Sequence, residues 1–283
     1  MRYTECRGGK MRSMKKILTG MLCLLLLFGC SAEQAADSTE NLELTFFKIG
    51  SADSMVLSAG NQTVLIDTGE DEDGEEIADY LKGEGIESID ALIITHFDKD
   101  HVGGADTVLK EVDVQQIFVP DYAEESEDYD EFLEAAENED VPIEVLDEEV
   151  AFTAGSANFT IYPPEETEYE QDNDYSLAVS VQHGENRFLF AGDAEETRLA
   201  ELMEQGDLAH TFLKVPHHGR YAENSSEFFS EVSPEIAVIT SSDKNTEDEE
   251  VVAALEDLGA DIYLTREGNI HMVSDEKSIE VTQ

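Results

Sequence analysis

Four side chains that can bind metal ions are packed into the stretch "THFDKDHVGG" (95–104). They are His96, Asp98, Asp100 and His101. Zinc and manganese both accept imidazole nitrogens and carboxylate oxygens as ligands, and an ordinary surface loop rarely needs so many of them together. The stretch therefore predicts a loop that binds divalent cations and is able to serve two neighbouring ions.

Two later segments repeat this design. One apolar run ends in Asp193 within "FLFAGDAEE" (188–196), and another ends in His217 and His218 within "LKVPHHG" (213–219). A carboxylate has two oxygens, so Asp193 is able to bridge two cations, which two-metal hydrolases hold about 3.5–4 Å apart. The three segments together predict one dinuclear site built from distant parts of the chain.

The elements that position these residues follow from hydrophobic periodicity. In α/β folds, ligands commonly bind at the carboxyl ends of strands, which is where these side chains occur. Each half of the chain runs from strands to a helix and then to an apolar strand that ends in ligand-type residues, which predicts two facing β-sheets covered by helices. Strands are expected within 44–49, 54–59, 63–69, 90–95, 115–120, 157–164, 176–184, 186–193, 212–219, 236–240, 261–265 and 269–274. Helices are expected at 75–86, from about 103, at 124–140, 194–205, 227–232 and 249–259.

The beginning of the chain has the pattern of an export signal. Lys15 and Lys16 precede the apolar run "ILTGMLCLLLLFGC", which is too short for a comfortable membrane span. Its ending resembles the lipobox of bacterial lipoproteins, in which cleavage leaves a lipidated cysteine, here Cys30, as the new N-terminus. A plain secreted protein and an uncleaved anchor helix are the alternatives. The expected organisation is a lipoprotein signal peptide at 1–29, a lipidated cysteine and flexible tether at 30–41, and one folded domain at 42–283.

Cysteine usage and charge fit a location outside the cytoplasm. Cys6 and Cys23 fall in the leader, so the rest of the chain cannot form an internal disulfide and depends on core packing and metal for stability. The leader holds six of the 17 basic residues and one of the 66 acidic ones. The rest of the chain therefore has 11 basic and 65 acidic residues and a net charge of −54. Such self-repulsion is relieved by salt, because the Debye length falls to about 3 Å at about 1 M, so a saline or alkaline habitat is expected.

Seven motifs together carry a resemblance to a known family. In chain order they are "KIGSADS" (48–54), "LIDTG" (65–69), "THFDKDHVGG" (95–104), "DNDYSLAVSV" (172–181), "FAGDAEE" (190–196), "LKVPHHG" (213–219) and "LGADIYLTREGNI" (258–270). The chain resembles the metallo-β-lactamase superfamily of hydrolases, and within it the hydrolase domain of the ComEC/Rec2 competence proteins and their stand-alone relatives. The likeness covers nearly all of residues 42–283.

The resemblance implies a metallo-β-lactamase fold, which is an αββα sandwich of two mixed β-sheets flanked by helices. Carried over by position, His96 and Asp98 would hold one metal ion, Asp100, His101 and His217 a second, and Asp193 both. Asp67 would orient the ligand loop from behind. Asp100 and His218 would be the catalytic residues, with His218 in contact with substrate or a leaving group. The cofactors expected are two divalent metal ions, Zn²⁺ or Mn²⁺.

The chain also departs from the family pattern. Asp98 stands where the superfamily usually has a second histidine, as in the ComEC-like branch, and the oxygen-rich set favours harder ions such as Mn²⁺. The middle histidine of the wider superfamily has no counterpart, because "DNDYS" (172–176) occupies that region. Its Asn173 and Ser176 are candidate substrate contacts that would hydrogen-bond a phosphate, or else they only cap a strand. The Gly-His-Pro element of ComEC-like proteins is replaced by "SSDKNTEDEE" (241–250).

These features support three functions. The leading hypothesis is a hydrolase that uses a metal-bridged hydroxide on phosphodiester bonds, in a small phosphodiester or a nucleic acid strand. The alternatives are hydrolysis of a small ester or lactone, and a non-catalytic surface lipoprotein that binds metal or ligand, which the absent Gly-His-Pro favours. No basic stripe is present for a long polyanion, so docking of a strand at low salt is disfavoured. The membrane is a partner through the lipid anchor, and no protein partner can be inferred. Three further histidines are interpreted without a site role: His183 as a turn residue, His210 in a connection and His271 in a strand.

Overall fold

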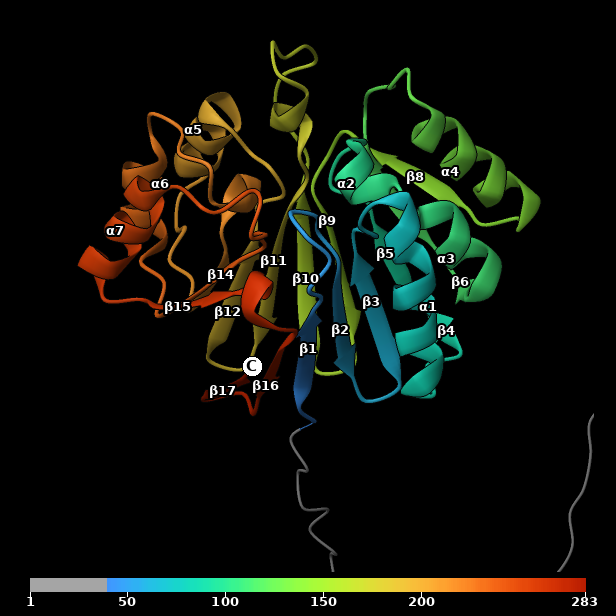
Figure 1. Cartoon of the computed structure of the whole chain (residues 1–283), viewed down its shortest axis with the longest axis horizontal. Helices are drawn as coiled ribbons and strands as arrows, with labels where there is room; N and C mark the ends of the chain where they lie inside the picture. The colour runs from blue at the N-terminus through green and yellow to red at the C-terminus, as the bar shows by residue number, and fades with distance from the viewer. Residues whose placement is uncertain (1–39) are drawn as a thin grey trace, which may run out of the picture. The chain divides into compact units, whose positions relative to one another are not determined.

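The computed structural model describes residues 40–283, which form two large β-sheets packed face to face with helices on both outer sides (Figure 1). The predicted signal peptide at 1–29, the predicted lipidation site Cys30 and nearly all of the predicted tether lie outside the described residues. Within the part of the chain that is described, no helix is long and apolar enough to cross a membrane.

The first sheet has eight strands in the order β17-β16-β1-β2-β3-β5-β7-β8. The pairs β3–β5, β5–β7 and β7–β8 are parallel, and the remaining neighbours are antiparallel. Its strands are β1 (Leu42–Phe46), β2 (Met55–Ala59), β3 (Gln62–Ile66), β5 (Ala91–Ile93), β7 (Ile117–Pro120), β8 (Ile143–Leu146), β16 (Ile270–Ser274) and β17 (Ile279–Thr282).

The second sheet has seven strands in the order β15-β14-β13-β12-β11-β10-β9. Strands β12 to β15 run parallel, and β9 to β12 form an antiparallel meander. Its strands are β9 (Val150–Ala154), β10 (Ala157–Tyr162), β11 (Ala178–His183), β12 (Asn186–Phe190), β13 (Phe212–Lys214), β14 (Ile236–Ile239) and β15 (Asp261–Leu264). A separate two-stranded ladder joins β4 (Ser88–Ile89) to β6 (Asp113–Val114).

Seven helices of the described region flank the sheets (Figure 1). The first four belong to the side of the first sheet, and the last three to the side of the second. They are α1 (Gly74–Gly83), α2 (Lys99–Val102), α3 (Ala105–Glu111), α4 (Glu127–Asn138), α5 (Glu196–Glu204), α6 (Ser225–Val232) and α7 (Glu249–Leu258).

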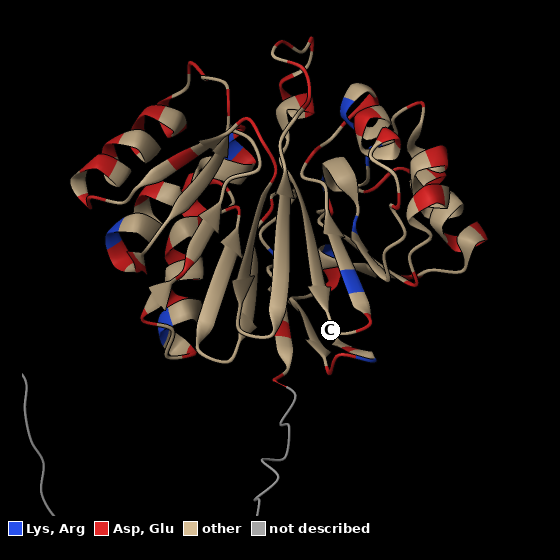
Figure 2. Ribbon diagram, turned by 180° about the vertical axis from the view of Figure 1, so that it is seen from behind, with Lys and Arg blue, Asp and Glu red and all other residues tan. Residues whose placement is uncertain are grey.

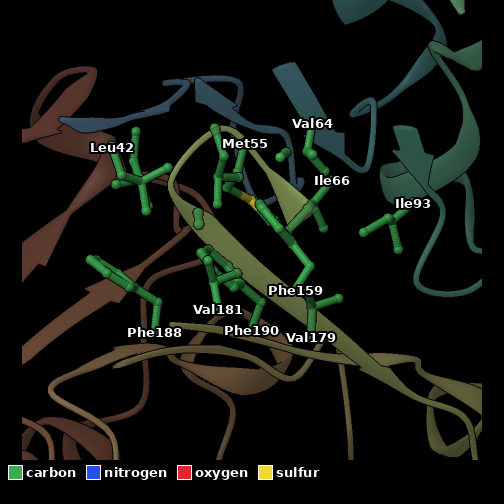
Figure 3. Close-up of a cluster of buried hydrophobic side chains, with 14 of the residues drawn as sticks. Leu42, Met55, Val64, Ile66, Ile93, Phe159, Val179, Val181, Phe188 and Phe190 are labelled. Carbon is green, nitrogen blue, oxygen red and sulfur yellow. The ribbon is translucent and has the colours of Figure 1, made fainter. Parts of the chain in front are cut away.

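Three apolar clusters hold these layers together. The central one lies between the sheets, where Ile66 and Ile93 of the first sheet face Phe159 and Phe190 of the second (Figure 3). The other two lie under the helices, one below α1, α3 and α4 and one below α5 to α7. Burial on both faces explains why β3, β5 and β7 read as continuous apolar runs and not as alternating strands. The predicted αββα sandwich is confirmed.

The differences from the predicted elements have local causes. Strands β8, β9 and β17 were not expected, because they are edge or near-edge strands with exposed polar positions and give a weak alternation signal. The metal-ligand loop contains the short helix α2, which sequence periodicity cannot resolve at four residues. The interpretation of His183 as a turn residue is wrong: it is the last residue of β11, fully buried, with Nδ1 2.8 Å from Ser274 Oγ and Nε2 2.8 Å from the Glu40 carbonyl.

Candidate metal centre

The predicted ligands meet because both sheets present the carboxyl ends of their parallel strands at one edge. The loops after β3 and β5 carry Asp67 and His96, and the loops after β12 and β13 carry Asp193 and His218. His101 comes from the short helix α2, which begins three residues after His96. Parallel pairing fixes this edge, so residues far apart in the chain reach one site.

Three imidazoles point their Nε2 atoms into the cluster. His101 Nδ1 donates to Asp67 Oδ2 at 2.9 Å, and His218 Nδ1 donates to the Thr240 carbonyl at 3.0 Å. His96 Nδ1 lies 3.2 Å from Thr95 Oγ1, and its ring centroid lies 4.1 Å from that of His101. Since donation from Nδ1 leaves the lone pair on Nε2, the neighbours select the tautomer that binds metal.

Asp193 lies at the middle of the cluster. One carboxylate oxygen, Oδ1, is 3.3 Å from His101 Nε2, and the other, Oδ2, is 3.0 Å from His218 Nε2. His218 Nε2 is also 3.4 Å from Asp100 Oδ2. Ligand atoms close enough to share an ion form three sets among the described residues: His96, His101 and Asp193; Asp100, His101 and His218; and Asp53, Asp67 and His101.

The donor atoms fit the metal ions that the family resemblance implies. Among the described residues, the Nε2 atoms of His96, His101 and His218 and the Oδ1 of Asp193 are buried without a hydrogen-bond partner. Buried polar atoms nearly always have partners, so unpartnered donor atoms that converge fit the coordination of a metal ion. Two imidazoles with a carboxylate are a ligand set that binds divalent transition metals.

The structure exchanges the predicted positions of the two adjacent histidines. His217 had been expected to hold metal and His218 to face substrate, but His218 contacts Asp193 and Asp100, whereas His217 Nδ1 lies 3.2 Å from Glu195 and its side chain is 31% exposed. Both histidines adopt the left-handed conformation, with φ of 48° and 50°. This turn rotates the second ring inward and the first outward, and such strained backbone occurs mainly at functional sites.

The two aspartates of the ligand loop lie at the outer side of the cluster. Asp98 Oδ2 is 3.8 Å from His96 Nε2, and its side chain is 40% exposed. Although burial alone would raise the value, the nearby His218 ring and the charge of His101 lower the pKa of Asp100 to about 2. Both carboxylates are therefore available as charged ligands near neutral pH.

Asp67 supports the cluster from behind, where the family resemblance had placed it. This fully buried carboxylate accepts from the Thr95 backbone N–H at 2.7 Å, from Thr95 Oγ1 at 2.8 Å and from His101. Its own φ is 56°, a left-handed conformation that aspartate tolerates better than most residues. The strand end therefore turns sharply and directs the carboxylate under the ligand loop.

The two candidate substrate contacts differ in exposure. Ser176 is fully buried, and its Oγ accepts from the Asp193 backbone N–H at 3.1 Å. This hydroxyl supports the loop that carries Asp193, which favours the structural alternative for Ser176 over a contact with substrate. Asn173 is half-buried, donates to Glu195 Oε1 at 2.9 Å and lies 3.4 Å from His217 Nε2. Asn173, Glu195 and His217 thus form a polar group at the rim.

Two residues at the back of the cluster were missed by the sequence interpretation. Asp53 and Lys214 are fully buried and form an ion pair, and Lys214 Nζ lies 3.5 Å from Asp193 Oδ1. Burial opposes the charge, but Asp53 and Asp193 raise the pKa of Lys214, so the ammonium is retained. A lysine inside the apolar strand "FLKV" was a signal that this strand faces a charged partner.

The imidazoles balance the carboxylates when no metal is bound. Burial lowers the pKa of His218, but Asp193 and Asp100 outweigh it and raise the pKa to about 9. In the same way Asp193 and Asp67 raise the pKa of His101 well above its ordinary value. Protons on these rings thus occupy the positions that cations would take.

Comparisons with known proteins agree with this geometry. Residues 48–242 match the model of the metallo-beta-lactamase superfamily. The chain is 29% identical over 260 residues to ComE operon protein 3 of Bacillus subtilis, with 83% of this chain and 32% of that protein covered. It is 27% identical over 229 residues to Recombination protein 2 of Haemophilus influenzae, with 78% of this chain and 26% of that protein covered. The chain therefore spans about a third or less of the length of these relatives.

Solved structures share the fold. The metallo-beta-lactamase fold protein YhfI from Bacillus subtilis superimposes with a TM-score of 0.55 at 12% identity, over 80% of this chain and 98% of that one. CmlA, a diiron beta-hydroxylase from Streptomyces venezuelae, superimposes with a TM-score of 0.51 at 15% identity, over 79% of this chain and 52% of that one. At such identities the likeness shows the fold alone. From the matched family model, the chain belongs to the metallo-β-lactamase superfamily, and its sequence relatives are proteins of the ComEC/Rec2 kind.

Proposed function

We propose that the protein is a metal-dependent hydrolase of phosphodiester bonds that acts outside the cytoplasm. One observation carries this proposal: three buried Nε2 atoms and Asp193 Oδ1, all without hydrogen-bond partners, converge at the edge shared by the two sheets. This arrangement supports a metal site over a purely structural cluster, because unpaired buried polar atoms cost stability that a structural cluster would not accept.

The residues divide into three roles. His96, His101, His218, Asp100 and Asp193 would hold the ions, with Asp98 closing the exposed side. When bound, divalent ions bring the pKa of water to about 7 and stabilise negative charge on a phosphoryl oxygen. Asp67 and Thr240 hold two of the imidazoles in the required tautomer. The rim group of Asn173, Glu195 and His217 lies where substrate would enter.

The charges around the site favour a small substrate over a long strand. Lys99 and Arg220 flank the ligand segments, but each pairs with a carboxylate at 3.2 Å, Glu70 and Asp248 respectively. Acidic residues are spread over the helices and loops of both halves, with few basic residues between them (Figure 2). A polyanion that tracks a groove requires unpaired basic residues, which these pairs do not provide.

A group of aromatic side chains near the ligand loop favours a substrate with an aromatic part. Tyr122 accepts from the Phe97 backbone N–H at 2.6 Å, between two metal ligands, and stacks on Tyr175 with ring centroids 4.2 Å apart. Tyr169 meets Tyr175 edge to face at 4.9 Å. A nucleobase stacks well on such rings. This aromatic group supports a nucleotide-containing phosphodiester over a lactone.

The test is turnover by the full-length protein after metal removal with EDTA and reloading with Mn²⁺ or Zn²⁺ in high salt. We expect metal-dependent hydrolysis of bis-p-nitrophenyl phosphate, and of dinucleotides faster than single-stranded DNA. Hydrolysis of a lactone panel alone would support the ester alternative. Metal uptake without turnover of any of these compounds would support the non-catalytic alternative.

We also propose that Cys30 carries a lipid that anchors the protein to the outer side of the cell membrane, as the lipobox-like sequence indicates. Metabolic labelling with an alkyne fatty acid tests this. Label and membrane association are expected in the wild type and absent in Cys30→Ala, while Cys23→Ala should retain both. Equal labelling of the wild type and Cys30→Ala would contradict the proposal.

A further inference from the structure

An ion pair outside the predicted ligand set lies directly behind the metal centre. Lys214 is completely buried, and every partner of its ammonium belongs to this region. Nζ donates to the Gly192 carbonyl at 3.2 Å, pairs with Asp53 and lies 3.5 Å from Asp193 Oδ1. That same Oδ1 has no hydrogen-bond partner and is 3.3 Å from His101 Nε2. The Lys214 ammonium and the His101 ring are therefore the two groups that can carry positive charge beside Asp193 Oδ1.

Asp53 connects the pair to two of the imidazoles. Its Oδ1 is 3.5 Å from His218 Nδ1, and its Oδ2 is 3.9 Å from His101 Nδ1. Its backbone joins the two ligand-bearing loops of the first sheet, because its N–H donates to the Asp100 carbonyl and its carbonyl accepts from the Gly69 N–H. Asp53 thus contacts both loops that hold the ions, although no metal role had been predicted for it.

A buried ion pair needs an explanation other than stability. Desolvation usually cancels the attraction of such pairs, so apolar side chains of the same size often serve a fold equally well. Here the pair lies in a centre that also holds Asp67, Asp100 and Asp193, and carboxylates this close repel one another when no metal is bound. A fixed ammonium among them lowers that repulsion and holds the neighbouring carboxylate in place.

We propose that Lys214 and Asp53 are a positioning pair, in which the buried ammonium fixes the Asp193 carboxylate so that it can serve both ion sites. The proposal rests on the metal centre of the proposed function. Lys214 Nζ and His101 Nε2 lie beside Asp193 Oδ1, whereas Oδ2 faces His218 Nε2. Without the pair, Asp193 would still bind one ion, but its second contact would lose its fixed orientation.

The test removes both charges together. A single change would leave a buried unpaired charge and unfold the protein for a trivial reason, whereas Asp53→Asn with Lys214→Met keeps the volume and removes the pair. The double variant is expected to fold, with a melting temperature of its metal-free form near that of the wild type. Isothermal titration with Mn²⁺ should show the second equivalent weakened about 10–100-fold. The visible spectrum of the Co²⁺-loaded protein should also change.

Two controls complete the experiment. Removing the exposed pair Arg187–Asp207 with Arg187→Met and Asp207→Asn should leave Mn²⁺ titration and the Co²⁺ spectrum unchanged. Lys214→Arg keeps the charge and should restore part of the second equivalent relative to the double variant. Native titration and a native Co²⁺ spectrum in the double variant would overturn the proposal, even if the wild type hydrolyses phosphodiesters.

A structure of the metal-loaded wild type tests the same contact without any substitution, should the double variant fail to fold. We expect Lys214 Nζ to remain beside Asp193 Oδ1 with ions bound. An ammonium turned away from Asp193 would overturn the proposal. Failure of the proposed function looks different: metal would bind in the wild type with the Lys214 contact intact, but no phosphodiester would be cleaved.

Discussion

His218 Nε2 lies 3.0 Å from Asp193 Oδ2, whereas the adjacent His217 turns away from Asp193 and contacts Glu195. Two consecutive left-handed residues separate the directions of these rings.

His218→Ala should therefore abolish metal-dependent turnover and remove one equivalent of bound ion. His217→Ala should retain both equivalents and lower turnover only through weaker substrate contact. Inductively coupled plasma analysis and Mn²⁺ titration of the two variants check this, with exposed His271→Ala as the matched control. Loss of metal in His217→Ala alone would contradict it.

Asp67→Asn should weaken metal binding about 10–100-fold with little change in backbone conformation, because asparagine also tolerates the left-handed φ of 56° at this position. An amide cannot accept from Thr95 and from His101 as the carboxylate does. His101 would then shift its proton to Nε2, the atom that must bind the ion. Titration with Co²⁺ measures the effect, and Asp90→Asn, which alters a carboxylate remote from the site, should bind normally. Equal affinity in both variants would exclude the tautomer argument.

Arg198→Met should cost about 3–5 kcal/mol in the free energy of unfolding, as expected for a broken buried ion pair. Arg198 is fully buried, pairs with Glu201 at 2.8 Å and donates to the carbonyls of Ser176 and Tyr162. Urea unfolding of the metal-free protein measures the loss.

The matched control for this variant is Arg187→Met, which breaks an exposed pair and should cost about 0–1 kcal/mol. Similar losses in the two variants would mean that Arg198 does not hold the loop of Ser176 to helix α5. A larger loss for Arg198→Met would also be accompanied by weaker metal binding, since Ser176 accepts from the Asp193 backbone.

The titration of His218 and Asp100 predicts that the metal-free protein is most stable between about pH 4 and 6.5. His218 has a pKa raised from 6.5 to about 9, so its contribution is complete below pH 6.5 and is lost as pH rises through 9. Asp100 has a pKa lowered from 3.8 to about 2, so its contribution is complete above pH 3.8 and is lost as pH falls toward 2. Urea midpoints measured across pH in EDTA test this, and His218→Gln should flatten the alkaline side. An unchanged alkaline slope in that variant would refute the assignment.

Salt should raise the melting temperature strongly between about 0.1 and 2 M KCl, because the Debye length shortens from about 10 Å to below 3 Å. Residues 30–283 carry a net charge of −54, and acidic residues occur along the helices of both outer layers (Figure 2). Differential scanning fluorimetry measures the shift, and a sucrose series separates screening from general exclusion of solute. A flat salt response would contradict the predicted saline or alkaline habitat.

The sequence determined the layers and the edge at which the site lies. Apolar runs that end in Asp67, His96, Asp193 and the histidine pair predict strands by their length and composition, and parallel pairing brings their carboxyl ends together. These signals are local and strong, so the sandwich and the converging segments were predicted correctly. Edge strands β8, β9 and β17 were not, because half-exposed strands have weak patterns.

Only the tertiary structure decided which side chains face inward. One residue of offset in a strained turn exchanges His217 and His218, and no periodicity reports a φ of 48° or 50° in a histidine. The buried Ser176 and the Lys214–Asp53 pair were hidden for a related reason: their partners come from other strands, and a contact across two sheets leaves no pattern within either segment. The sequence specifies which side chains are available to bind metal, whereas packing of the two sheets decides which way each side chain points and which residues it contacts.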